Sequence, residues 1–177
     1  MSDMRRAERR PQLGGKRYAN DGVTLAVASP MTRLAVRGEA HPANVALSFD
    51  FPTEPNRAAS QDGRHALWLG PDEWLFLAAG ENSDVPSGEG FTAVDVSHRN
   101  VAFHVEGARA RETLEAGCPR DLRDASFPVG ACARTLVGKA EVIVWREAEQ
   151  KYHVEVWRSF APYLWDFLKL AADDALL

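Results

Sequence analysis

Asp95, Ser97 and His98 are the residues that could form a hydrolytic centre, because an acid, a nucleophile and a base lie in one short segment. In a serine hydrolase these three side chains must converge, and they normally come from separate elements. On a strand, however, Ser97 and His98 point to opposite faces. The chain also lacks the Gly-x-Ser-x-Gly elbow of many hydrolases. We therefore interpret the segment as a strand ending in a polar turn, and we predict no catalytic residue in this chain.

The histidines and cysteines show no local metal-binding pattern. The five histidines are His41, His65, His98, His104 and His153. None forms a His-x-x-x-His or His-Glu-x-x-His motif, and neither Cys118 nor Cys132 has a second Cys or a His at zinc-ligand spacing. Only residues distant in sequence could assemble a metal site, and we predict none. The two cysteines are expected to be free thiols in a reducing compartment.

The sequence also contains no motif for nucleotide binding by a glycine-rich loop. The chain contains neither the Walker motif nor Gly-x-Gly-x-x-Gly. No cluster of acidic residues resembles a pair of acid/base carboxylates. The motifs alone therefore leave any cofactor-binding residues unknown.

The elements that would position any site are mostly strands. Alternation, β-branched bulk and flanking turn residues predict strands at 31–37, 43–49, 65–69, 74–79, 91–96, 101–105, 140–146 and 151–157. Gly70-Pro71-Asp72-Glu73 predicts a hairpin turn, because proline presets the backbone angle at its second position. Strands 91–96 and 101–105 are expected to pair with each other. Strand 140–146 is apolar on both faces, which is typical of a central strand.

Two helices are predicted in the second half of the chain. The first spans about 108–116, and Gly117 would end it in the left-handed conformation. The last helix follows Ser159, a potential cap, and has Pro162 in its first turn, where a missing N–H costs little. Its predicted apolar stripe consists of Phe160, Tyr163, Leu164, Phe167, Leu168 and Ala171.

Trp165 is the residue most indicative of a partner. At 100° per residue it lies far from the centre of the stripe, on the flank shared with Lys169. Tryptophan is enriched at interface hot spots, so we predict Trp165 and Lys169 as a partner interface. The alternative is that another segment of the same chain covers Trp165.

Composition indicates an ordinary globular protein, and the predicted hairpins and helices agree with an α+β fold. The chain has 177 residues, 45% hydrophobic and 26% charged, with a net charge of -4. The first 20 residues carry about +4 and the remainder about -8. We predict a flexible basic N-terminal arm at 1–22 and one domain, or two small lobes sharing a core, at 23–177. An acidic body argues against nucleic acid, and the absence of a long apolar stretch or signal peptide predicts a cytoplasmic protein without membrane contact.

Three blocks of sequence resemble the gamma subunit of heterotetrameric sarcosine oxidase. The first block is 69–75 (LGPDEWL). The second comprises 94–100 (VDVSHRN), 105–107 (VEG) and 114–122 (LEAGCPRDL). The third comprises 127–130 (FPVG), 134–135 (RT), 139–141 (KAE) and 156–168 (VWRSFAPYLWDFL). In combination these blocks are specific, and the resemblance covers about residues 30–170.

The resemblance implies a fold and an assembly. Gamma subunits are similar to the folate-binding domain of the glycine-cleavage aminomethyltransferase, so antiparallel sheets with ferredoxin-like lobes are expected. The family enzyme contains alpha, beta, gamma and delta chains and oxidatively demethylates sarcosine to glycine and hydrogen peroxide. The one-carbon unit passes to tetrahydrofolate. The resemblance places FAD, FMN, NAD and tetrahydrofolate mainly with the alpha and beta chains, and zinc with delta.

One departure from the aminomethyltransferase pattern decides the predicted role. That enzyme carries a glycine pair followed by acidic residues, whereas the comparable stretch here is 138–142 (GKAEV), without an aspartate pair. We therefore transfer no catalytic residue and predict an accessory, structural gamma subunit. The alternative is a stand-alone folate or pterin-binding module, in which Arg134 or Arg158 would pair with a carboxylate.

Overall fold

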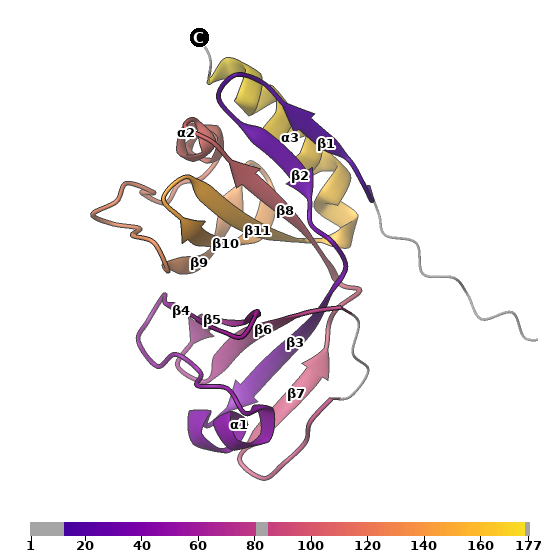
Figure 1. The fold of residues 1–177 in the computed structure, drawn as a ribbon, viewed down its shortest axis with the longest axis vertical. Coiled ribbons are helices and arrows are strands. Elements are labelled where there is room, and N and C mark those ends of the chain that lie inside the picture. Colours follow the sequence, from indigo (N-terminus) through magenta and orange to yellow (C-terminus); the bar gives the residue numbers. More distant parts are fainter. Residues whose placement is uncertain (1–12, 81–84, 176–177) are drawn as a thin grey trace, which may run out of the picture.

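Two antiparallel sheets face each other in the computed structural model, which describes residues 13–80 and 85–175. Figure 1 shows the sheets as two inner layers, with helices on their outer faces. The strand pairs within both sheets are antiparallel, so the α+β prediction with antiparallel sheets is confirmed. No helix in the described ranges is long and apolar enough to cross a membrane.

The larger sheet has six strands in the order β1-β2-β8-β11-β10-β9. Their bounds are β1 Arg17–Ala19, β2 Thr24–Val27, β8 Asn100–Glu106, β9 Cys132–Val137, β10 Ala140–Ala148 and β11 Lys151–Trp157. Helices α2 (Ala110–Glu115) and α3 (Ala161–Asp174) cover its outer face, and a 3-10 turn, η1 (Arg158–Phe160), leads into α3. The main hydrophobic core lies between this sheet and the two helices.

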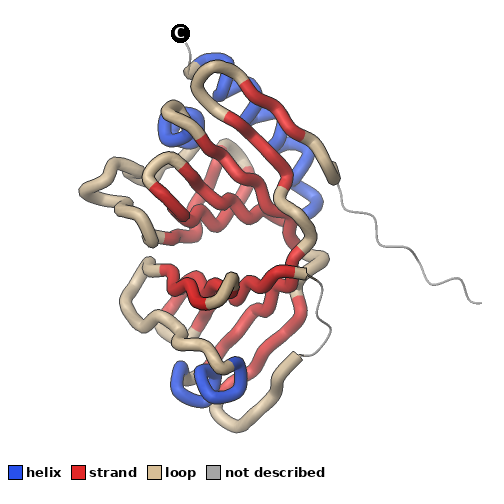
Figure 2. The backbone as a smooth tube through the Cα atoms, viewed as in Figure 1, coloured by secondary structure: helices blue, strands red, loops and turns tan. Residues whose placement is uncertain are grey.

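The smaller sheet has five strands in the order β4-β5-β6-β3-β7. Their bounds are β3 Met31–Gly38, β4 Ala58–Gln61, β5 Arg64–Gly70, β6 Glu73–Ala79 and β7 Phe91–Asp95. Helix α1 (Ala40–Leu47) lies on its outer face over a core rich in aromatic rings. The tube in Figure 2 shows the resulting order of helix, sheet, sheet and helix.

The predicted hairpins are present, but one strand assignment and one strand pairing are wrong. Residues 43–49 fall largely in α1, where tertiary packing of Ala43 against the small sheet outweighs β-propensity. The segments 91–96 and 101–105 form β7 and β8, but these do not pair. The chain leaves the small sheet after β7 and enters the large one at β8.

The N-terminal arm prediction is wrong in part. Residues 1–12 lie outside the described residues, but Arg17–Ala19 form β1 and pair with β2. This strand extends the large sheet along α3, and Tyr18 packs against the main core. The short segment has little apolar bulk of its own, so its order depends on a surface that only the folded chain provides.

The last helix begins later and is rotated relative to the predicted stripe. Ser159 lies in η1 and does not cap α3, although Pro162 occupies the first turn as expected. Buried positions are Ala161, Leu164, Trp165, Leu168, Ala171 and Ala172. Phe160 and Tyr163 are therefore exposed and Trp165 is covered, because the large sheet and β1 contact the helix on the Trp165 side.

Gly117 is required for a different reason than the one predicted. Helix α2 ends at Glu115, and Gly117 does not adopt a positive φ. A Cβ at Gly117 would lie 2.5 Å from the Phe167 ring and 2.7 Å from the Gly138 nitrogen. The close approach of α3 and the β9–β10 turn therefore demands glycine here.

The two sheets meet through apolar side chains and one buried ion pair. Leu67, Leu75 and Leu77 of the small sheet contact Cys132, Ile143 and Trp145 of the large sheet. Beside this cluster, Arg33 Nε lies 2.8 Å from Glu155 Oε2, and both side chains are almost wholly buried. Main-chain hydrogen bonds from Ala58 to Gly130 and from Cys132 to Asn56 close the edge at β9.

We predict that Arg33→Met will destabilise the folded chain by about 3–5 kcal/mol, because Glu155 would keep a buried charge without its guanidinium partner. Urea unfolding followed by circular dichroism measures the change. The matched control is Arg37→Met on the same strand, whose pair with Glu73 is exposed. That control should lose less than about 1 kcal/mol. Equal losses in the two variants would contradict a special role for the buried pair.

Candidate functional site

Polar groups between the sheets form one continuous chain of contacts. Arg33 of β3 donates to both oxygens of Glu155 on β11, at 3.0 and 2.8 Å. Glu155 Oε1 also lies 2.8 Å from His153 Nε2. The other ring nitrogen of His153 lies 3.5 Å from Glu147 Oε1. Charges of alternating sign therefore run from one sheet into the other.

The surroundings set the charge states of these groups. Burial alone would raise the pKa of Glu155, but the His153 hydrogen bond and the Arg33 charge outweigh it and lower the pKa to about 2. Burial likewise opposes a charge on His153, yet Glu147 and Glu155 together raise its pKa. Glu155 is consequently an ionised carboxylate that can only accept hydrogen bonds.

A cavity of about 170 Å³ opens at the His153 end of this chain. It is lined by His65 and Leu77 of the small sheet and by His104, Trp145, Glu147 and His153 of the large sheet. Three of the five histidines thus meet here, although the sequence showed no motif that joins them. Burial lowers the pKa of both His65 and His104.

A second intersheet cavity, of about 220 Å³, lies on the Glu155 side. Arg37, Arg99 and Arg134 line it together with Glu73, Glu141 and Trp157. Arg134, predicted as a carboxylate partner, instead lies 2.6 Å from Glu73. The other predicted partner, Arg158, is exposed in η1 and does not line this cavity. Ligand pockets usually span about 300–1,000 Å³, so this cavity is small for a folate.

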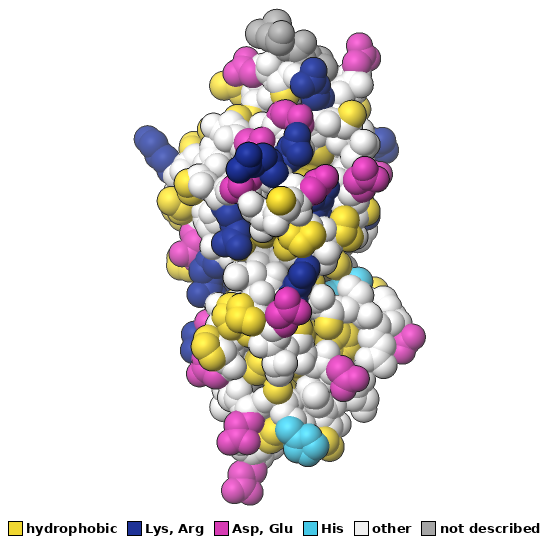
Figure 3. Space-filling view, turned by 90° about the vertical axis from the view of Figure 1, so that its left-hand side faces the viewer, with side chains coloured by type: hydrophobic (Ala, Val, Ile, Leu, Met, Phe, Trp, Pro, Cys, Tyr) yellow, Lys and Arg dark blue, Asp and Glu magenta, His cyan; other side chains and the backbone are white. Residues whose placement is uncertain are grey.

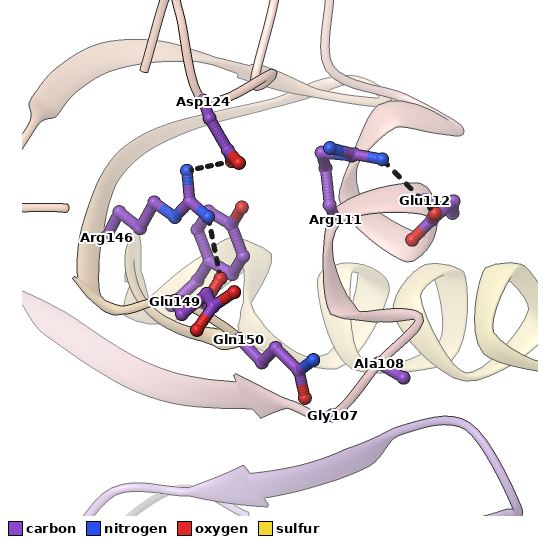
Figure 4. Close-up of a pocket in the computed structure, with 9 residues that line it drawn as sticks. Gly107, Ala108, Arg111, Glu112, Asp124, Arg146, Glu149 and Gln150 are labelled. Atoms are coloured by element: carbon purple, nitrogen blue, oxygen red, sulfur yellow. Dashed lines mark hydrogen bonds and ion pairs between the residues drawn. The ribbon is translucent and has the colours of Figure 1, made fainter. Parts of the chain in front are cut away.

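A third cavity, of about 180 Å³, lies near α2 at the end of the β10–β11 hairpin. Figure 4 shows Arg146 and Arg111 on opposite sides of it, with Asp124 reaching toward Arg146. Arg146 donates to Asp124 at 2.7 Å and to the carbonyl oxygens of Phe127 and Glu149. These bonds tie the loop after α2 to the hairpin, so we assign this cavity a structural role.

Strand β7 ends at Asp95 and a turn follows at 97–99, as predicted. The Ser97 hydroxyl donates to Asp95 at 2.5 Å and accepts the backbone N–H of Arg33 at 2.9 Å. Both interactions stabilise the crossover between the sheets. Ser97 is therefore held by Asp95 and by the backbone of Arg33.

Trp165 does not lie on the surface. It is 6% exposed, packs at 5.9 Å between ring centroids from Phe103, and is covered by Lys16. The alternative that the same chain covers it is thus correct. Lys169 is exposed and lies over Tyr18. The sequence argument failed because β1 was not recognised as an ordered strand.

Other aromatic side chains are exposed where β11 leads into α3. Trp157 is 47% exposed, Phe160 41% and Tyr163 38%. We call these three residues together the aromatic patch, although Trp157 also lines the second intersheet cavity and Tyr163 accepts the backbone N–H of Lys139. The signal was present in the sequence, since all three lie within one short segment, but the helical stripe assigned Phe160 and Tyr163 to the core.

Charge on the face drawn in Figure 3 is mixed. Lys and Arg side chains gather over the half built on the six-stranded sheet, and Asp and Glu side chains lie among them. Nucleic-acid binding requires a field of one sign. This face therefore carries no field of one sign, and the absence of a nucleic-acid partner stays a prediction.

Comparison with known proteins gives a consistent family. Residues 35–174 match the model described as "Sarcosine oxidase, gamma subunit family". A sarcosine oxidase subunit gamma from Arthrobacter sp. is 32% identical over 139 residues, covering 73% of this chain and 68% of that protein. The same subunit from Corynebacterium sp. (strain U-96) is 34% identical over 113 residues, covering 60% of this chain and 55% of that protein.

Solved structures support the same relationship. A chain of the heterotetrameric sarcosine oxidase from Corynebacterium sp. U-96, in complex with pyrrole 2-carboxylate, matches with a TM-score of 0.80 and 26% identity. The match covers 90% of this chain and 88% of that one. Glycine cleavage system aminomethyltransferase T from Bartonella henselae shares the fold, with a TM-score of 0.59 at 14% identity. It covers 85% of this chain and 49% of that one.

We predict that the Cys132 thiol is inert in the folded protein. Both cysteines are free, and burial raises the pKa of Cys132 to about 12. Because the raised pKa keeps the thiol protonated, iodoacetamide at mildly alkaline pH should label a Cys118→Ser variant only after guanidinium chloride is added. Mass spectrometry measures the labelling. Rapid labelling without denaturant would show that the sheets separate readily.

Proposed function

This chain belongs to the sarcosine oxidase gamma subunit family, and from that premise we propose that it is the accessory, structural subunit of a heterotetrameric sarcosine oxidase. The assembly would oxidatively demethylate sarcosine to glycine with formation of hydrogen peroxide. The one-carbon unit would pass to tetrahydrofolate. Alpha, beta and delta subunits would be the partners of this chain.

The aromatic patch is the observation that carries the accessory role. Each sheet packs against its helices around a hydrophobic core, yet three large aromatic side chains stay exposed. Trp and Tyr are enriched among the residues that dominate protein–protein binding energy. A partner subunit that covers Trp157 and Phe160 would remove apolar surface from water. We therefore propose the patch, and no longer Trp165, as the contact surface.

None of the three cavities described above has the volume that a flavin, NAD or folate cofactor would need. The largest of the three cavities described above holds about 220 Å³, less than the usual volume of a ligand pocket. Several charged residues of its lining are engaged in internal pairs, Arg37 and Arg134 with Glu73 and Glu155 with Arg33. FAD, FMN, NAD and tetrahydrofolate are accordingly assigned to the partner subunits, and zinc to delta.

Purification of the tagged chain from its native host tests the proposal. We expect a large flavin-containing chain to accompany it, and the recovered assembly to produce peroxide when sarcosine is added. Recovery of the chain alone under gentle conditions, without flavin, would contradict the subunit role.

We predict that Trp157→Ala together with Phe160→Ser will weaken assembly by about 2 kcal/mol or more, roughly a 30-fold rise in the dissociation constant, because a desolvated aromatic contact is lost. Size-exclusion chromatography and light scattering at decreasing concentration measure dissociation. The control is Val45→Ser, which removes an even more exposed apolar side chain, on α1. If the double variant stays assembled, or if the control dissociates as readily as the double variant, the patch is not the interface.

A further inference from the structure

Three potential metal ligands converge from three neighbouring strands. His104 on β8 lies directly opposite His153 on β11 in the antiparallel register. Glu147 comes from β10 on the other side of β11, where the register shifts between Arg146 and Ala148. Such a bulge re-aims a side chain. One ligand atom from each of His104, Glu147 and His153 lies within 4.8 Å of the other two.

The hydrogen bond between His153 and Glu155 determines which ring nitrogen of His153 faces the three-residue cluster. Its Nε2 lies 2.8 Å from Glu155, whose carboxylate can only accept, so Nε2 carries a proton. In the neutral ring Nδ1 then has a free electron pair, and it faces Glu147 Oε1 at 3.5 Å. In this neutral form the two atoms are acceptors that face each other, an arrangement that a cation between them would stabilise.

His104 offers a second nitrogen to the same point. Its Nδ1 is buried and has no hydrogen-bond partner among the described residues. It lies 3.9 Å from the same oxygen, Glu147 Oε1. An imidazole nitrogen of this kind loses its hydration on folding without compensation, unless a cation occupies the space in front of it.

These separations suit coordination better than direct hydrogen bonding. Ligand atoms about 2.0–2.2 Å from a tetrahedral zinc ion lie roughly 3.4 Å apart. The observed 3.5 and 3.9 Å are close to that value. We propose that His104 Nδ1, His153 Nδ1 and Glu147 Oε1 form a binding site for a divalent ion of the zinc class.

The surroundings of the site match the outer contacts of known metal centres. A histidine ligand usually donates its other N–H to a carboxylate, as His153 does to Glu155, and that carboxylate is itself bound by Arg33. Lys151 Nζ lies 2.7 Å from Glu147 Oε2, which holds the carboxylate and leaves Oε1 for the ion. Two imidazoles favour zinc over the oxygen-seeking magnesium and calcium.

An open coordination position would face the cavity of about 170 Å³. Two histidines and one carboxylate are the protein ligands of several zinc sites in which water completes the tetrahedron. His65 lines the same cavity from the opposite sheet, and its Nδ1 lies 2.9 Å from Ser60 Oγ. A bound ion would therefore lie beside this cavity and connect β8, β10 and β11 of the larger sheet.

A proton is the competing occupant. Without metal, a doubly protonated His153 could pair with Glu147, since its Nδ1 lies 3.5 Å from Glu147 Oε1. This competition makes binding of Zn²⁺ release protons. The two occupants are distinguished by direct titration with the metal.

The experiment uses the full chain without a polyhistidine tag, treated with chelator and then titrated with Zn²⁺ against a chromophoric zinc indicator. We expect one ion per chain. His104→Ala and Glu147→Gln should each lower the affinity at least about 100-fold, since each removes a ligand. Co²⁺ should give the visible absorption of a four-coordinate site in the wild type and not in His104→Ala.

His65→Ala is the matched control, because His65 lines the same cavity without belonging to the ligand set. It should bind Zn²⁺ within about threefold of the wild type, and circular dichroism should show that all variants are folded. A folded wild type that binds no Zn²⁺ at micromolar concentration would overturn the proposal in favour of the proton. Unchanged affinity in His104→Ala and Glu147→Gln would also overturn it, by placing the ion elsewhere.

Discussion

The contact between the two sheets depends on the buried pair of Arg33 and Glu155. Both side chains have left water almost completely, and a charge transferred into a protein interior is costly unless it is paired and hydrogen-bonded. The guanidinium meets both carboxylate oxygens, so the pair is formed only when β3 and β11 face each other at one register. Apolar contacts such as those of Leu77 and Trp145 would tolerate a small sliding of one sheet over the other. The ion pair between Arg33 and Glu155 would not.

The same pair organises the polar groups beyond it. Because Arg33 keeps Glu155 ionised, Glu155 fixes the proton on one nitrogen of His153, and the opposite nitrogen is turned toward Glu147. The orientation of the histidine cluster is thus set from the other sheet. A cluster on one sheet therefore has its geometry determined by a residue of the second sheet, which connects the fold directly to the candidate metal site.

The outer faces explain why this chain suits an assembly. Helices α2 and α3 cover the large sheet, α1 covers the small one, and β1 with Lys16 covers the flank where Trp165 lies. The aromatic patch remains outside this coverage. The fold is shared with an aminomethyltransferase at 14% identity, yet the intersheet charges here pair with one another. The chain therefore combines a common fold with a surface that favours a partner.

Local sequence determined the hairpins at 64–79 and 140–157, because their turns and alternating strands are encoded within a few neighbouring residues. The family blocks and the absence of a catalytic motif were likewise readable from the sequence. The burial of Trp165 and the exposure of Phe160 depended on which side of α3 the sheet and β1 approach. Likewise, the meeting of His104, Glu147 and His153 depended on the order of three strands and a bulge. Only the tertiary structure decided these features, because contacts between residues distant in sequence leave no periodic signal along the chain.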